Sequence, residues 1–120
     1  MSPALDPVPP ARALRATGRV VRVVQLDTAG DAEVSAVVDA VAGADMVVMV
    51  ATAGTDPAAA ARIGRACSDA RVVTTTLVVR GPDATDAMLA RTLARVRPWS
   101  LMVVIAGDRG YLGDILGSFR

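Results

Sequence analysis

The chain has 120 residues, of which 52% are hydrophobic and 21% charged, with thirteen basic and twelve acidic side chains interleaved along its length. This length suits one domain with a substantial core, and the near-balance of charge gives no electrostatic case for binding nucleic acid or an anionic membrane. No apolar run approaches the roughly 20 residues of a spanning helix, and the absence of histidine excludes His-ligated zinc sites and His-based catalytic triads.

Residues 1–18 are rich in proline, alanine and arginine and show no sustained periodicity. We therefore expect a flexible lead-in, with at most a frayed turn around residues 11–16, before a single α/β domain at residues 19–120. The opening residues lack the basic start and apolar stretch of a signal peptide, so we expect the protein in the cytoplasm.

Four apolar segments alternate with helical patterns. Strands are predicted at residues 20–26, 45–51, 72–79 and 101–105. The first helix is predicted from Val34, Val37, Val38 and Val41, which recur at i, i+3, i+4 and i+7 before a stop at Gly43.

The second helix is expected to begin at Asp56-Pro57, because aspartate is a good N-cap and proline suits the first helical position. Its inward residues would be Ala60, Ile63 and Cys67, and the single cysteine is interpreted as a small core residue rather than a nucleophile. A third helix is predicted from the stripe Met88, Leu89, Leu93 and Val96, and a short fourth one at residues 111–119.

Strands that alternate with helices predict a parallel sheet, and uninterrupted apolar runs such as M-V-V-M-V indicate strands covered on both faces. The expected fold is a three-layer α/β/α sandwich with a mostly parallel four-stranded sheet. Three good helices and one poor one hardly cover such a sheet, so we predict an apolar patch or open edge that docks on another subunit or partner. The aromatic residues Trp99, Tyr111 and Phe119 either close the core or belong to that interface.

Residues 44–70 read as strand, loop and helix, a junction that in α/β proteins directs backbone N–H groups and a helix dipole toward a ligand. The candidate ligand-binding residues are Thr52, Ala53, Gly54, Thr55, Asp56 and Asp108. The hydroxyls and amides of this loop could hold a nucleotide or a phosphosugar. The simpler interpretation is that Thr52 and Thr55 only satisfy turn amides and cap the helix.

Two motifs support a family resemblance. The stretch G-A-D-M-V at residues 43–47, with its flanking helices, and L-M-V-V-I-A-G-D-R-G-Y at residues 101–111 resemble the GTPase domain of FtsZ, the bacterial tubulin-like cell-division protein. The likeness covers residues 32–115. It implies a Rossmann-like fold and a site for GTP or GDP, and it puts Asp108 and Arg109 in the places of the family's N-D-R-L-L motif.

The loop departs from that family. Where the family reads G-G-G-T-G-T-G, residues 54–60 read G-T-D-P-A-A-A, so that Pro57 removes a donor, alanines add Cβ atoms and Asp56 adds negative charge. Gly107 replaces an asparagine near the guanine, and residues 1–19 contain nothing like the family's earlier Gly-rich loop. Since the family completes hydrolysis with an acidic loop from a neighbouring subunit, which this chain lacks, we expect no GTP hydrolysis by this chain alone.

The loop A-T-A-G-T-D also resembles the S-x-S-G-x-T loop of sugar isomerase (SIS) phosphosugar-binding domains. An enzyme is a third class, since Asp27, Asp108 and Arg109 follow strands where α/β active sites gather, but Asp108-Arg109 reads equally as a surface pair. No catalytic base and no metal-ligand spacing can be named. The function expected is an interaction domain that contacts itself or a larger protein partner, and the alternative is a regulatory domain that binds a nucleotide or phosphosugar.

Overall fold

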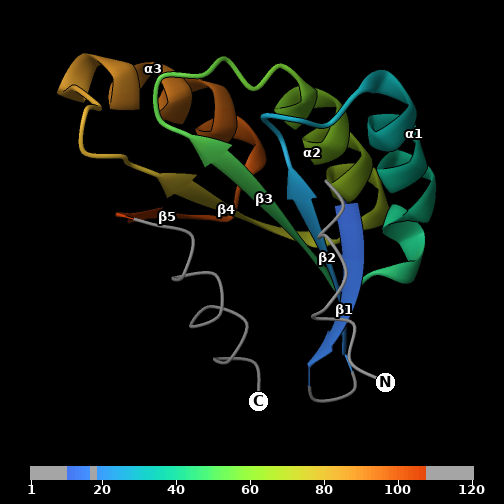
Figure 1. Cartoon of the computed structure of the whole chain (residues 1–120). Coiled ribbons are helices and arrows are strands. Elements are labelled where there is room, and N and C mark those ends of the chain that lie inside the picture. Colours follow the sequence, from blue (N-terminus) through green and yellow to red (C-terminus); the bar gives the residue numbers. More distant parts are fainter. Residues whose placement is uncertain (1–10, 17–18, 108–120) are drawn as a thin grey trace, which may run out of the picture.

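The computed structural model describes residues 11–16 and 19–107 of the chain. Five strands and three helices alternate (Figure 1): β1 Ala11–Ala16, β2 Arg19–Gln25, α1 Asp31–Ala40, β3 Met46–Thr52, α2 Ala59–Ala70, β4 Val73–Val79, α3 Asp86–Val96 and β5 Met102–Ala106. Two short 3-10 helices, η2 Val41–Gly43 and η3 Arg97–Trp99, follow α1 and α3.

The strands lie in one sheet in the order β1-β2-β3-β4-β5. Strands β2 to β5 are parallel, whereas β1 is antiparallel to β2. Each parallel strand is followed by its spatial neighbour, and the sheet always grows in the same direction. Because such crossovers are right-handed, α1, α2 and α3 must lie on the same face of the sheet, as Figure 1 shows.

The central strand β3 explains why the sheet is so apolar. Six of its seven residues are buried. Val47, Met49 and Ala51 join the core beneath the helices, whereas Val48 and Val50 belong to a second apolar cluster on the opposite face of the sheet. A strand that is buried on both faces needs no polar alternation, which is why its sequence is a continuous apolar run.

The helices bury the residues that their spacing predicts. Ala60, Ile63 and Cys67 of α2 are buried, and Leu93 and Val96 of α3 are buried with them. These side chains pack against the helix-side face of the sheet in one cluster. Hydrophobic periodicity therefore identified the inward face of α2 and, in the second half of α3, the buried residues Leu93 and Val96.

The expected α/β architecture with a parallel four-stranded core, consistent with a Rossmann-like fold, is confirmed. The expectation that residues 11–16 belong to a flexible lead-in is wrong, because these residues form the edge strand β1 through six register pairs with β2. All helices of the described residues cover one face, and the expected fourth helix at residues 111–119 lies outside them.

Trp99 is half-buried and packs against the helix-side core. Among the described residues, no helix combines the length and hydrophobicity needed to cross a membrane.

Gly64 is a point of close approach within this helical layer. A Cβ at this position of α2 would collide with Cβ and Cγ of Trp99 in η3, because the two backbones meet there. Only a residue without a side chain allows η3 to pack this closely on α2.

We predict that Gly64→Ala lowers the free energy of unfolding by about 1–3 kcal/mol, because overpacking outweighs the usual gain from replacing a helical glycine. The measurement is urea denaturation followed by circular dichroism. Gly43→Ala is the matched control, since a Cβ at Gly43 meets nothing within 4 Å. Equal stability of the two variants would contradict the packing described here.

Candidate functional site

The candidate site is the loop between β3 and α2, residues 53–58, at the carboxyl ends of the parallel strands. The loops at residues 26–30 and 80–85 follow β2 and β4 at the same end of the strands, so the candidate loop lies between them. Loops at this edge carry the active sites of many α/β proteins. Those sites usually occur where the strand order reverses, and the sequential order of the strands here provides no reversal.

Asp27 anchors the start of the loop from the β2 side. Its Oδ2 accepts a hydrogen bond from Thr52 Oγ1 at 2.6 Å, and its Oδ1 accepts from Thr52 N at 3.2 Å. Thr55 Oγ1 lies 3.1 Å from Asp27 Oδ1 and 2.7 Å from Thr52 O, so its single proton is shared between these acceptors. Sequence reasoning placed Asp27 at the end of a strand as a candidate catalytic residue, whereas its contacts are those of a loop anchor.

Thr92 anchors the loop from the other side. Its Oγ1 accepts a hydrogen bond from Gly54 N at 2.9 Å and donates one to Thr55 O at 2.8 Å. The residue is completely buried on the inner face of α3. Sequence analysis missed Thr92. The available signal was a threonine at an inward position, between Leu89 and Val96, where an unsatisfied hydroxyl would be costly.

Met88 fills the space in front of Gly54. The glycine has φ +98, and a Cβ built on it would lie 2.5 Å from Met88 Cε. Gly54 therefore supplies both the left-handed backbone conformation and the room that the methionine requires. The one glycine of this loop is therefore occupied by contacts with α3.

Four backbone amides of the loop donate to acceptors within the protein. The donors and acceptors are Ala53 N to Val79 O at 2.8 Å, Gly54 N to Thr92 Oγ1 at 2.9 Å, Thr55 N to Thr52 O at 3.1 Å and Ala58 N to Asp56 O at 2.9 Å. Pro57 has no N–H to offer. A phosphate group would have to displace these bonds, because it is bound by several N–H groups that converge on it.

Asp56 does not cap α2, contrary to the sequence prediction. The helix begins at Ala59, its N-cap is Ala58, and no side chain bonds to its first turn. The carboxylate of Asp56 instead forms a forked pair with Arg95 of α3, with 2.9 Å between Oδ1 and Nε and 3.4 Å between Oδ2 and Nη2. Both side chains are more than half exposed, so the pair orients the loop more than it stabilises the fold.

An open pocket of about 310 Å³ lies beside the loop, between the first turns of α1 and α2. Its polar lining comes from Asp31, Asp56 and Arg62. The guanidinium of Arg62 lies 3.7 Å from Asp31 and donates to Ser35 Oγ at 3.1 Å. Two carboxylates and one engaged arginine make this pocket a poor receptor for a phosphate.

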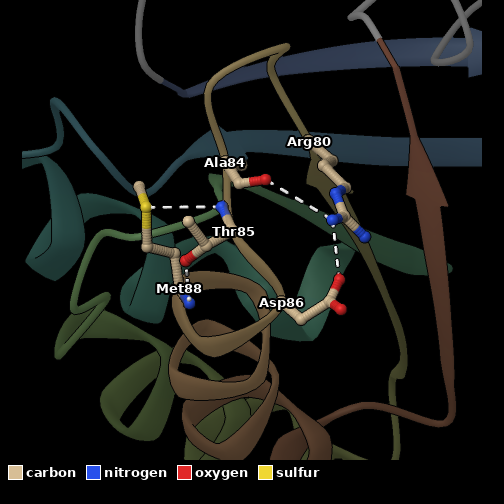
Figure 2. A network of polar contacts seen from close by, with 5 residues as sticks. All are labelled: Arg80, Ala84, Thr85, Asp86 and Met88. Atoms are coloured by element: carbon tan, nitrogen blue, oxygen red, sulfur yellow. Dashed lines mark hydrogen bonds and ion pairs between the residues drawn. The ribbon is translucent and has the colours of Figure 1, made fainter.

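The loop before α3 fixes the helix that closes the site (Figure 2). Thr85 Oγ1 accepts from Met88 N at 3.1 Å, and Thr85 N lies 3.5 Å from Met88 Sδ, so the first turn of α3 is capped reciprocally. Arg80, the residue after β4, donates to Asp86 Oδ1 at 2.7 Å and to Ala84 O at 3.4 Å. These bonds hold α3 at the angle that directs Met88 and Thr92 into the neighbouring loop.

Several expected site residues have a different status. Asp108 and Arg109 lie outside the described residues, and Ala53 is buried. Within residues 11–16 and 19–107, no cluster of three or more acidic or cysteine side chains could hold a metal ion. Cys67 is buried as predicted, and burial raises the pKa of its thiol although a hydrogen bond with Thr74 opposes the shift.

The fold and the loop together define an α/β domain of the Rossmann-like class in which the junction that commonly binds phosphate is closed by its own side chains. Comparison of the chain with protein-family models, curated proteins and solved structures finds no match.

We predict that Thr92→Val, which removes both hydrogen bonds at constant volume, lowers the free energy of unfolding by about 1–3 kcal/mol. It should also speed hydrogen exchange of the Gly54 amide, measured by NMR. The control Thr92→Ser keeps the hydroxyl and should keep that amide protected. Unchanged exchange in Thr92→Val would show that the hydroxyl does not hold the loop.

Cys67 should be inert in the folded chain. We expect its reaction with Ellman's reagent at neutral pH to be slower by about 100-fold or more than in urea, because burial blocks access and the raised pKa lowers the thiolate fraction. In a pH titration, the thiolate of Cys67 should form at a higher pH in the folded chain than in the unfolded chain, because the pKa of the buried thiol is raised. Equal rates in the two states would contradict the described core.

Proposed function

We propose that this chain is a reduced α/β domain, similar in its core to the GTPase domain of FtsZ, that acts through contacts with other proteins and does not hydrolyse GTP. The observation that carries the proposal is the closed loop between β3 and α2. Asp27 and Thr92 hold this loop from opposite sides, and Met88 occupies the space in front of Gly54.

The energetics favour a structural loop over a phosphate site. Each internal hydrogen bond contributes about 0.5–1.5 kcal/mol, so an anion that recruits the amides of Gly54, Thr55 and Ala58 must first offset three such bonds. It must also approach the carboxylates of Asp27 and Asp56, which repel it. The residues that make the loop rigid are therefore the same ones that make it a poor anion receptor.

Exposed apolar side chains supply the positive argument for protein contacts. Leu101 is 79% exposed, and Met102 and Ile105 are each 47% exposed. Leu101 immediately precedes β5, at the opposite end of the sheet from β1, and Ile105 lies on the same face of the strand. Met102 and the exposed Val73 of the adjacent strand β4 lie on the other face. Large apolar side chains exposed along one border of a sheet are typical of a protein-binding region.

The competing function is a regulatory domain that binds a nucleotide or a phosphosugar at residues 52–56. The open pocket beside the loop is the feature that such a ligand would use, but its polar lining is mainly acidic. A cation-bound ligand is the form that these carboxylates would tolerate best, so magnesium belongs in any binding test.

We expect GTP, GDP, glucose 6-phosphate and inorganic phosphate, each at 1 mM with magnesium, to leave the melting temperature of the chain unchanged. A ligand at about 100 times its dissociation constant stabilises by about 2.7 kcal/mol, which corresponds to roughly 10 °C for a domain of this size. Differential scanning fluorimetry measures the shift. A rise of this size with GTP or GDP would overturn the proposal, and a rise with the sugar phosphate alone would support the phosphosugar alternative.

A further inference from the structure

The two edges of the sheet differ in charge. The edge strand β1, A-R-A-L-R-A, carries two arginines in six residues. At the other edge, residues 100–107, which include all of β5, read S-L-M-V-V-I-A-G and contain no charged residue and no proline. Charges and prolines are the usual protection of an edge strand against pairing with other chains. Among the described residues, the β1 edge carries this protection and the β5 edge does not.

The unprotected edge is also apolar at its surface. β5 pairs with β4 through five register pairs, from Met102 opposite Thr75 to Ala106 opposite Val79. No strand of the described residues pairs with its other side. Val103 packs on the helix-side core, and Leu101 and Ile105, which lie on the same side of the strand two residues before and after it, are exposed. Within the part of the chain that the structure describes, the outer backbone groups of β5 and the exposed Leu101 and Ile105 therefore lie along the same short stretch.

We propose that β5 pairs with β5 of a second copy of this chain, antiparallel and centred on Val103. The proposal rests on the proposed function of protein contacts and names the partner. Residues 100–107 of two copies are complementary, because this stretch brings no like charges together, whereas a partner chosen by charge would need an acidic or basic edge. Two-fold symmetry is the commonest arrangement of homo-oligomers and requires such a self-complementary surface.

The proposed register matches the exposed residues. With Val103 on the two-fold axis, Leu101 lies opposite Ile105 of the second copy, and Met102 lies opposite its Val104. Leu101, Val103 and Ile105 share one side of the strand, so the pairing joins them into an apolar strip of six side chains across the two copies. A two-fold axis perpendicular to the sheet keeps the helices of both copies on the same face. The result is one continuous sheet of ten strands, five from each copy.

The test is sedimentation velocity of the full chain from 1 to 100 μM. We expect a dimer, and we expect Ile105→Lys and Leu101→Lys each to raise the dissociation constant at least tenfold by placing two charges in the strip. Ala36→Lys is the matched control, because Ala36 is exposed on α1, away from β5, and should leave the dimer intact. Circular dichroism melts check that the lysine variants remain folded.

Cross-linking tests the register separately. Two Val103→Cys side chains would face each other across the axis at a Cα separation of about 4.5–5.5 Å, which a disulfide can span. Mild oxidation should therefore give a covalent dimer, whereas Ala36→Cys should give none.

A chain that stays monomeric at 100 μM, or a dimer unaffected by both lysine variants, would overturn the β5 pairing. Such a result leaves the proposed function intact if nucleotides and sugar phosphates still cause no thermal shift, since the contacts then involve a different protein. A monomer stabilised by GTP would overturn the pairing and the proposed function together.

Discussion

The structure depends on the constraint that parallel crossovers are right-handed. Because every strand from β2 to β5 is followed by its spatial neighbour, this constraint places α1, α2 and α3 on one face of the sheet. It sets α3 beside the loop that precedes α2, where Thr92 and Met88 can reach Gly54. In the described residues, no later crossover follows β5 to cover that strand. The closed loop follows from the handedness of the crossovers, and the exposed edge follows from β5 being the last described strand.

The closed loop shows how a junction suited to anions becomes structural. Four of its amides donate to a buried threonine and to carbonyls of the chain, and Asp27 accepts from Thr52 N just before the loop. Asp27 acts at one end and Thr92 at the other, and the intervening glycine tolerates the conformation that both bonds require. The arrangement is rigid because its donors and acceptors come from three separate segments, the loop after β2, the loop itself and α3.

The two edge strands of the sheet differ in the charge of their sequences. The sequence of β1 contains two arginines, a residue type that discourages edge pairing, whereas the run S-L-M-V-V-I-A-G offers apolar side chains and backbone groups that no described strand pairs with. In the proposed function the protein-binding surface and the loop between β3 and α2 are therefore separate regions. In this proposal the loop contributes stability, and β5 contributes recognition.

Local sequence patterns determined the parallel strands β2 to β5 and the inward faces of the helices, because burial on one or both faces imposes a period that can be read from Val34 and Val37, or from the continuous run in β3. Only the tertiary structure decided the rest. Asp56 meets Arg95 rather than the first turn of α2, and Thr92 meets a loop 37 residues away, because side chains distant in sequence compete for the same polar groups. A local pattern such as a capping motif or a helical stripe looks the same in the sequence whether or not a distant partner exists. Whether Asp56 caps the helix or pairs with Arg95 is therefore decided only when the chain folds.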